Sequence, residues 1–186
     1  MRLSRILHPQ YAALIVMATA AYNDTGRFGL ALLWTALLLL CVLLPVLLLT
    51  HLGIRQGRYG DFTVPDRADR HFIYGVGLVG VGLFCLAGRV LDAPPTVMAV
   101  AWAMLIAGAL SAVINLVWKI SIHAGSLAGA VCALIYVCGL AALPLLAIIP
   151  LVGWARVAST QHTVAQVVGG TLLAGAVTFG VLVWLG

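Results

Sequence analysis

The sequence predicts an all-α protein, a polytopic bundle of about six to seven transmembrane helices forming one integral membrane domain over residues 1–186. Hydrophobic residues make up 63% of the chain, charged residues only 8%, and the mean hydropathy is +1.15. Apolar runs of about 20 residues, enough to cross the hydrocarbon of a bilayer, recur along the chain. Although the formal charge is +5, so little soluble surface excludes nucleic acid as a partner.

The apolar runs place the spans in chain order. The first run follows Arg2 and Arg5, and since no small-residue cleavage site follows it, we expect a retained helix. The expected spans are 9–23, 28–52, 72–91, 96–118, 122–141, 143–156 and 163–185. The first is short and can lie at the membrane interface instead, which would leave six spans. The sixth contains Pro144 and Pro150, which predict a kinked or partly re-entrant segment because proline removes a backbone donor.

Three polar segments interrupt these runs. The first is the 53–71 loop, the only long charged segment, and its charged residues are Arg55, Arg58, Asp61, Asp66, Arg67, Asp69 and Arg70. The second runs from Lys119 to His123, and the third runs from Arg156 to Gln166. Two predicted spans separate each segment from the next. We therefore expect all three on the same membrane face, where they can form one site.

The sequence gives no sign of a metal or another cofactor. All four cysteines lie inside apolar runs and are expected to pack as small apolar side chains, without disulfides or metal. Glutamate is absent, and no carboxylate cluster lies within the spans, which favours metal-independent chemistry. One alternative remains open, a prenyltransferase-like site in which loop aspartates hold diphosphate through magnesium; these are Asp61, Asp66 and Asp69.

The polar segments contain the groups that phosphoryl transfer through a covalent phosphohistidine requires. One imidazole attacks phosphorus, a second protonates the leaving alkoxide, and cations stabilise the phosphate oxygens. Ionisable side chains are costly at membrane depth, so a functional role is the leading interpretation of His123, Arg156 and His162. The alternative for the cations at helix ends is that they extend to lipid headgroups.

These segments resemble the motifs of the type 2 phosphatidic acid phosphatase superfamily of membrane lipid phosphatases, which are Lys-x6-Arg-Pro, Pro-Ser-Gly-His and Ser-Arg-x5-His-x3-Asp. Arg156, His162 and Gln166 reproduce the spacing of the third motif, and Ser121 and His123 keep the register of the second. The resemblance implies that His162 is the nucleophile, Arg156 a phosphate clamp and His123 the general acid. It also implies that Ser121 contacts the phosphate.

The first motif is matched only as a source of cations. Arg58 and Arg67 are nine residues apart rather than seven, and no proline follows Arg67. We expect the loop to supply a cationic pair, with Arg67 favoured and Arg58 or Arg70 as its companion. Lys119 is expected to replace the missing lysine.

Other positions also depart from the family pattern, and two of them bear on the expected chemistry. Gln166 stands where the family has an aspartate, and its neutral amide oxygen accepts from Nδ1–H but stabilises imidazolium less. A loop acid such as Asp66 can substitute, although loop aspartates also pair with neighbouring arginines. Ile122 replaces a glycine beside the expected phosphate site.

The positive-inside rule predicts that the motif face is cytoplasmic. Lys and Arg on the motif face are Arg2, Arg5, Arg55, Arg58, Arg67, Arg70, Lys119 and Arg156, against Arg27 and Arg89 on the other. The predicted function is a membrane phosphatase that hydrolyses a phosphate monoester or diphosphate of an isoprenoid or glycerolipid. The alternative is a non-catalytic protein that binds or transports a phospholipid or prenyl phosphate. The partners are thus the lipid phosphate and the membrane, and no feature specifies an oligomeric state.

Overall fold

A computed structural model describes residues 9–60 and 67–186, and within these ranges the chain is helical and has no strands. The helical segments are α2 (Pro9–Thr25), α3 (Phe28–Leu38), η1 (Leu39–Leu43), α4 (Leu44–Arg55), α5 (Arg67–Val90), α6 (Pro95–Val117), α7 (Ile122–Cys138), η2 (Gly139–Ala147), α8 (Ile148–Ala158) and α9 (Val164–Leu185). Five helical stretches among the described residues are long and apolar enough to cross a membrane. The predicted all-α membrane class is confirmed at this level.

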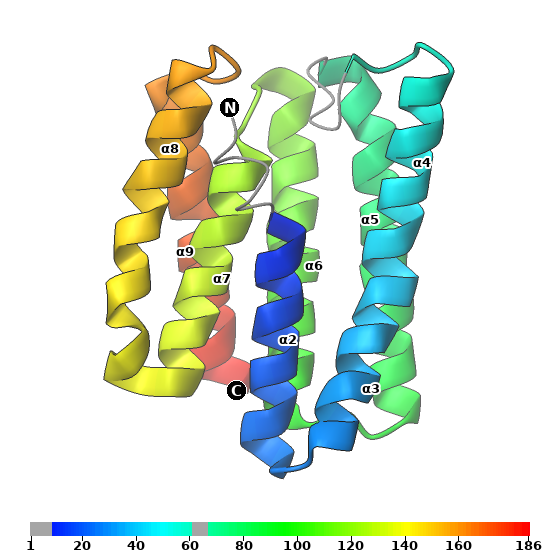
Figure 1. The fold of residues 1–186 in the computed structure, drawn as a ribbon, viewed down its shortest axis with the longest axis vertical. Coiled ribbons are helices and arrows are strands. Elements are labelled where there is room, and N and C mark those ends of the chain that lie inside the picture. Colours follow the sequence, from blue (N-terminus) through cyan, green and yellow to red (C-terminus); the bar gives the residue numbers. More distant parts are fainter. Residues whose placement is uncertain (1–8, 61–66) are drawn as a thin grey trace.

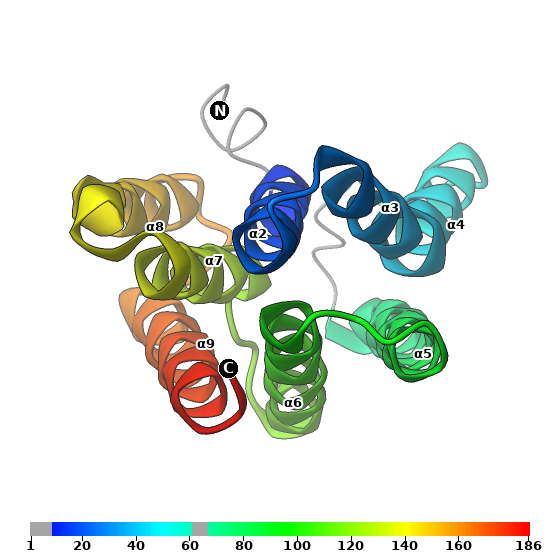
Figure 2. The ribbon, with the colours of Figure 1, turned by 90° about the horizontal axis from the view of Figure 1, so that it is seen from below.

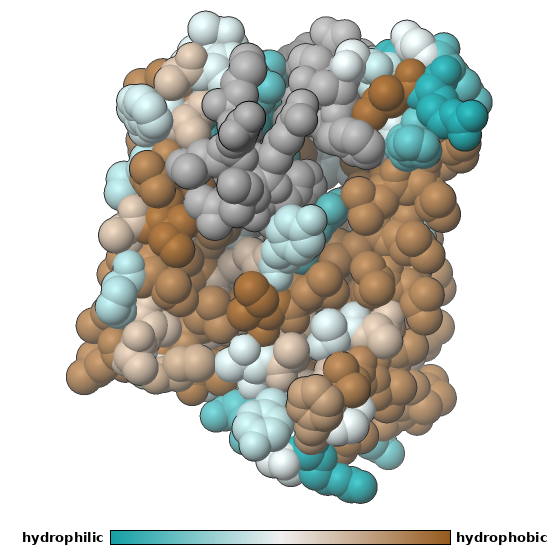
Figure 3. Space-filling model, in the orientation of Figure 1, coloured by the Kyte–Doolittle hydropathy of each residue, from teal (hydrophilic) through white to brown (hydrophobic). Residues whose placement is uncertain are grey.

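Figures 1 and 2 show a bundle in which α5, α6 and α9 form one row and α2, α3, α4 and α8 form another, with α7 between α8 and α9. The connections from α4 to α5, from α6 to α7 and from α8 to α9 all lie at the same end of the bundle (Figure 1). This end is called the motif end below. On the face that Figure 3 shows, apolar side chains cover most of the middle, and hydrophilic ones gather towards the two ends.

The stretch from Ile122 to Ala158 is a helical hairpin. Gly139 ends α7 with φ +63°, a conformation that glycine adopts without steric cost, and α8 then runs back beside α7 (Figure 1). The returning segment begins as a 3₁₀ helix that contains Pro144. The predicted distortion is therefore present, and it is followed by regular α-helix up to Ala158.

The charged loop is shorter than the sequence predicted. Helix α4 continues to Arg55, and α5 begins at Arg67 rather than near residue 72. Helix α5 extends beyond its apolar part because the polar residues 67–71 include no proline or glycine that would break a helix. As a result, Arg70 belongs to the first turn of α5 and does not lie in a loop.

The largest group of buried apolar side chains lies in the half of the bundle away from the motif end. Trp34 of α3 and Phe84 of α5 pack there edge to face, with ring centroids 6.0 Å apart. At the far end, Asp24 accepts hydrogen bonds of 2.8 Å from the backbone N–H and the hydroxyl of Thr96. The Asp24 carboxylate thereby caps the start of α6. This half holds the helices together, whereas the motif end surrounds a cavity.

Candidate functional site

The connection between α6 and α7 is held against the first turns of α9. The Ser121 backbone N–H donates to the carbonyl of Gln166 at 3.2 Å. Gly170 permits this approach, because a Cβ at that position would lie 2.5 Å from the Ser121 carbonyl oxygen. The fold therefore brings the second and third polar segments of the sequence into direct contact.

His162 lies immediately before α9 and is only 6% exposed. Thr163 and Gln166 form a capping box, in which Thr163 N–H donates to the Gln166 side-chain oxygen at 3.1 Å and Gln166 N–H donates to the Thr163 hydroxyl at 3.3 Å. The same Gln166 oxygen lies 3.2 Å from Nδ1 of His162. Because an amide oxygen can only accept, Nδ1 carries the proton in this pair, and Nε2 of the neutral ring keeps its lone pair.

Three cations surround this imidazole. Arg156, in the last turn of α8, is 2% exposed, and Arg70 is 4% exposed. Burial, as the largest cause, and the positive charges of Arg70, Arg156 and Lys119 together lower the pKa of His162 from its usual 6.5 to about 4. The hydrogen bond with Gln166 acts in the opposite direction. The ring is therefore neutral at physiological pH.

Arg70 connects α5 to the same cluster. Its guanidinium lies 3.5 Å from the carbonyl oxygen of Ile120, at the limit for a hydrogen bond, and Ile120 is the residue before Ser121. Four parts of the chain that lie apart in the sequence thus contribute to one site: α5, the 118–121 connection, the end of α8 and the start of α9.

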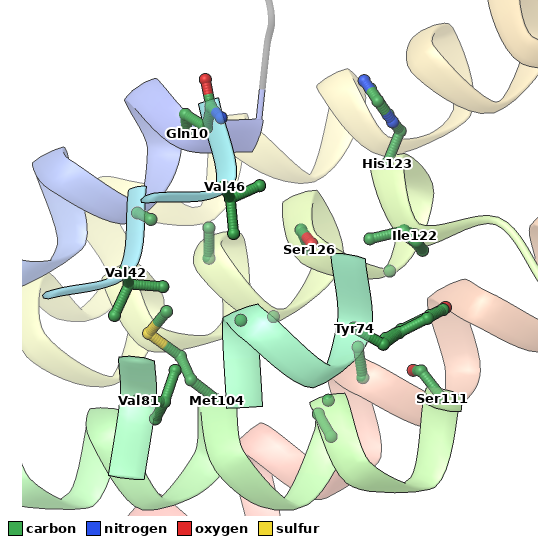
Figure 4. Close-up of a pocket in the computed structure, with 18 of the residues that line it drawn as sticks. Gln10, Val42, Val46, Tyr74, Val81, Met104, Ser111, Ile122, His123 and Ser126 are labelled. Carbon is green, nitrogen blue, oxygen red and sulfur yellow. The ribbon is translucent and has the colours of Figure 1, made fainter. Parts of the chain in front are cut away.

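A cavity of about 350 Å³ opens from this cluster into the bundle (Figure 4). The polar side chains that line its motif end are Arg70, Ser121, His123, Arg156 and His162. Along α5 the lining continues from Arg70 to Val81, a rise of about 16 Å, which is about half the thickness of a bilayer's hydrocarbon. The cavity is therefore polar at one end and mainly apolar over its length.

The structure brings together most of the residues that the sequence singled out. His162, Arg156, Arg70, Ser121 and His123 share the cavity, with His123 in the first turn of α7. Gln166 contacts His162, and Lys119 is close enough to lower the pKa of His162. In Figure 4 the ring of His123 extends away from Tyr74 and Ser111, so it belongs to the outer part of the cavity.

Arg58 is not brought to the site. Gly57 adopts φ +71° just after α4, and the Arg58 N–H donates to the carbonyl of Gly53 at 2.8 Å, which folds this segment back onto the helix end. The Arg58 side chain is exposed and does not line the cavity. Asp66 and the side chain of Arg67 lie outside the described residues, as do Asp61 and the side chain of Asp69.

Several cavity hydroxyls were not singled out from the sequence, among them those of Tyr74 and Ser111. Tyr74 follows Arg70 by four residues on α5 and lines the same cavity, as does Ser111 of α6. The hydroxyls of Tyr74 and Ser121 are buried without a hydrogen-bond partner among residues 9–60 and 67–186. Buried polar groups are normally paired, so these unpaired hydroxyls are available to a polar ligand in the cavity. The four-residue spacing from Arg70 was the available sequence signal for Tyr74.

Comparisons with protein-family models, curated proteins and solved structures gave no match for this chain. Within the part of the chain that the structure describes, no group of three His, Cys, Asp or Glu residues is placed to hold a metal ion, and the cysteines are unpaired. The site thus consists of a neutral imidazole, cationic side chains and hydroxyl groups. These groups suit a tetrahedral oxyanion attached to an apolar chain.

Proposed function

We propose that this protein is an integral membrane phosphatase that removes phosphate from a lipid phosphate through a covalent phosphohistidine. One observation carries the proposal: His162, with Nδ1 held by Gln166, lies beside buried cations at the polar end of an apolar cavity. The cavity suits a lipid because its lining beyond this end is mainly apolar. The motif spacing shared with the type 2 phosphatidic acid phosphatase superfamily supports the same reaction.

In the proposed reaction, Nε2 of His162 attacks phosphorus, and the bond between phosphorus and the lipid oxygen breaks. His123 donates its proton to that leaving oxygen. In the second half, His123 takes a proton from water, the water oxygen attacks phosphorus, and the bond between nitrogen and phosphorus breaks to release inorganic phosphate. Arg70 and Arg156 stabilise the charge on the phosphate oxygens in both steps, with Lys119 adding positive charge nearby.

The Ser121 hydroxyl supplies one further hydrogen bond to the phosphate. Its burial without a partner among the described residues fits this role. Arg70 fills the cationic role that the sequence assigned to the 53–71 loop, and Arg67 stays a proposed companion. Arg58 is left out of the phosphate site because its side chain is exposed.

The protein is placed in the membrane with the motif end in the cytoplasm, following its excess of Lys and Arg. We propose that α2 and the η2–α8 segment cross the membrane in addition to the longer helices. This gives seven crossings in total and places the end of α9 on the external side. A cytoplasmic site would act on lipid phosphates made inside the cell.

Phosphate release by the purified protein tests the proposal. We expect phosphatidic acid or a prenyl phosphate to be hydrolysed in the presence of a metal chelator. His162→Ala should reduce release more than about 1,000-fold, because it removes the nucleophile. His51→Ala is the matched control, since His51 is exposed on α4 and does not line the cavity. Release that requires magnesium, or that survives in His162→Ala, would refute the mechanism.

A specific observation favours the second candidate function, lipid-phosphate binding or transport without hydrolysis. The partner of His162 is a neutral amide, which stabilises the imidazolium character of a phosphohistidine less than a carboxylate does. Tight binding of the same lipids without phosphate release, in wild type and in His162→Ala alike, would establish this alternative.

A further inference from the structure

The cavity contains a second polar level directly below the cationic cluster. Tyr74 lies one helical turn after Arg70 on α5, about 6 Å further along the axis, and both residues line the cavity. The Tyr74 hydroxyl is buried and has no hydrogen-bond partner within the described ranges. Leaving a buried hydroxyl unpaired is costly, so this group indicates a binding role.

The antiparallel register of α5 and α6 places Ser111 at the same level. A Cβ on Gly108 would lie 3.3 Å from Leu78, and one on Gly88 would meet Met98. A residue of α5 and the residue of α6 that faces it therefore have numbers that add up to 186. This register sets Tyr74 opposite residue 112, next to Ser111. Figure 4 agrees, since the Tyr74 ring extends towards the side of the cavity that carries Ser111.

The chemistry of the lining changes with depth. The basic residues of the described lining all lie at the motif end, namely Arg70, His123, Arg156 and His162. Below the hydroxyl level, α5 and α6 contribute only apolar side chains to the cavity: Leu78, Val81, Val100, Ala103, Met104 and Ala107. Elsewhere in the described lining, hydroxyls come from Thr50 of α4, Ser126 of α7 and the deeper Thr178 of α9, and Gln10 of α2 adds an amide. The order is thus cations, then neutral hydroxyls, then hydrocarbon.

We propose that Tyr74 and Ser111 form a subsite that binds an uncharged oxygen of the substrate, so that the site selects glycerolipid phosphates over prenyl phosphates. The inference rests on the proposed function and specifies its substrate class. In a glycerolipid phosphate, hydroxyl or ester oxygens follow within a few bonds of phosphorus. In a prenyl phosphate that place is hydrocarbon, which would leave the buried Tyr74 hydroxyl without a partner.

The absence of charge at this level of the described lining argues against a diphosphate. The second phosphate of a prenyl diphosphate would occupy the level of Tyr74, where neutral hydroxyls offer little compensation for its charge. Neutral donors match a neutral acceptor, and a site built to hydrogen-bond an oxygen discriminates strongly against analogues that lack it.

The test compares palmitoyl lysophosphatidic acid with hexadecyl phosphate, which has the same chain length but lacks the glycerol oxygens. The wild-type protein should prefer lysophosphatidic acid. Tyr74→Phe removes only the hydroxyl and should lower kcat/KM for lysophosphatidic acid about tenfold, with hexadecyl phosphate unaffected. Ser111→Ala should act in the same direction. Tyr136→Phe is the matched control, because Tyr136 is partly exposed on α7 and does not line the cavity.

Binding of both lipids, measured in parallel by displacement of a fluorescent lipid phosphate, separates the two proposals. If no lipid releases phosphate but Tyr74→Phe weakens binding of lysophosphatidic acid alone, the proposed hydrolysis fails and the subsite stands. Equal effects of Tyr74→Phe on both lipids, or no effect on either, would overturn the subsite. So would a wild-type preference for hexadecyl phosphate or geranylgeranyl diphosphate.

Discussion

The side-chain oxygen of Gln166 serves two purposes. It accepts from the Thr163 N–H, which completes the start of α9, and it meets the Nδ1 of His162. The position of the imidazole is therefore fixed by a helix cap, and the cap forms whether the residue is Gln or Glu. The charge at residue 166 can therefore be changed by mutation while the position of the His162 imidazole is kept.

Gln166→Glu should raise the pKa of His162 from about 4, because a carboxylate beside the ring favours the imidazolium form. An NMR titration of the labelled histidines measures the shift directly, and the acid limb of the pH–rate profile should move upward with it. Gln56→Glu places the same new charge on an exposed residue at the end of α4 and should leave both unchanged. An unshifted pKa in Gln166→Glu would contradict the observed contact.

The lowered pKa of His162 also determines how the stability of the folded protein changes with pH. His162 has a folded-state pKa below its usual 6.5, so between about pH 6.5 and pH 4 the unfolded chain binds more protons than the folded one. Its contribution to stability is therefore full above pH 6.5 and is lost as the pH falls through this window. Because Gln166→Glu should raise the folded-state pKa of His162, it should narrow the pH range over which this stability is lost.

Individual site residues were predictable where their spacing was specific. Arg156, His162 and Gln166 follow a fixed pattern, and the structure places them together. Arg58 was chosen for its charge alone, and the turn at Gly57 directs it to the surface. Tyr74 was overlooked because a tyrosine in an apolar helix is usually a packing residue.

At the scale of elements, glycines set how closely α7, α9 and the 118–121 connection approach one another. A Cβ on Gly125 would lie 2.9 Å from the carbonyl of Gly170, and one on Gly169 would lie 2.9 Å from the Trp118 ring. These contacts leave no room for a methyl group without movement of backbone or of a large ring. The position of Ser121 therefore depends on glycine in α9.

Gly170→Ala should displace Ser121 from α9 and lower phosphate release more than about tenfold, because small displacements of positioned groups are costly to catalysis. Gly180→Ala is the matched control, since a Cβ there meets nothing within 4 Å. Both changes favour helix formation by about 1 kcal/mol, so a difference between them reports on packing. Thermal unfolding of both variants should show that Gly170→Ala remains folded. Equal activity of the two variants would contradict this role of Gly170.

At the scale of the whole molecule, the helices and their order were predictable because apolar runs of membrane length are unambiguous. The rotation of each helix about its axis was not, because it depends on contacts such as Gly108 with Leu78. Which residues line the cavity follows from that rotation. The extension of α5 to Arg67 was also missed, because hydropathy locates the apolar part of a helix and not its polar end.

Topology reporters test the proposed orientation. A reporter inserted near Gly57, in the loop after α4, should behave as cytoplasmic, and the same reporter fused after Gly186 should behave as external. This pair of results requires an odd number of crossings between the two points. Identical behaviour at both positions would contradict the count, and an external loop would contradict the cytoplasmic site.

The unequal packing of the two ends has a consequence for local unfolding. Trp34, Phe84 and much of the large apolar cluster lie away from the motif end, whereas the polar part of the cavity lies at the motif end. Local opening requires least free energy where fewest buried contacts are lost. Amides of the first turns of α5 and α7 should therefore exchange hydrogen sooner than those around Phe84. Such exchange would show that the motif end, where the proposed substrate enters, opens while the other half of the bundle remains folded.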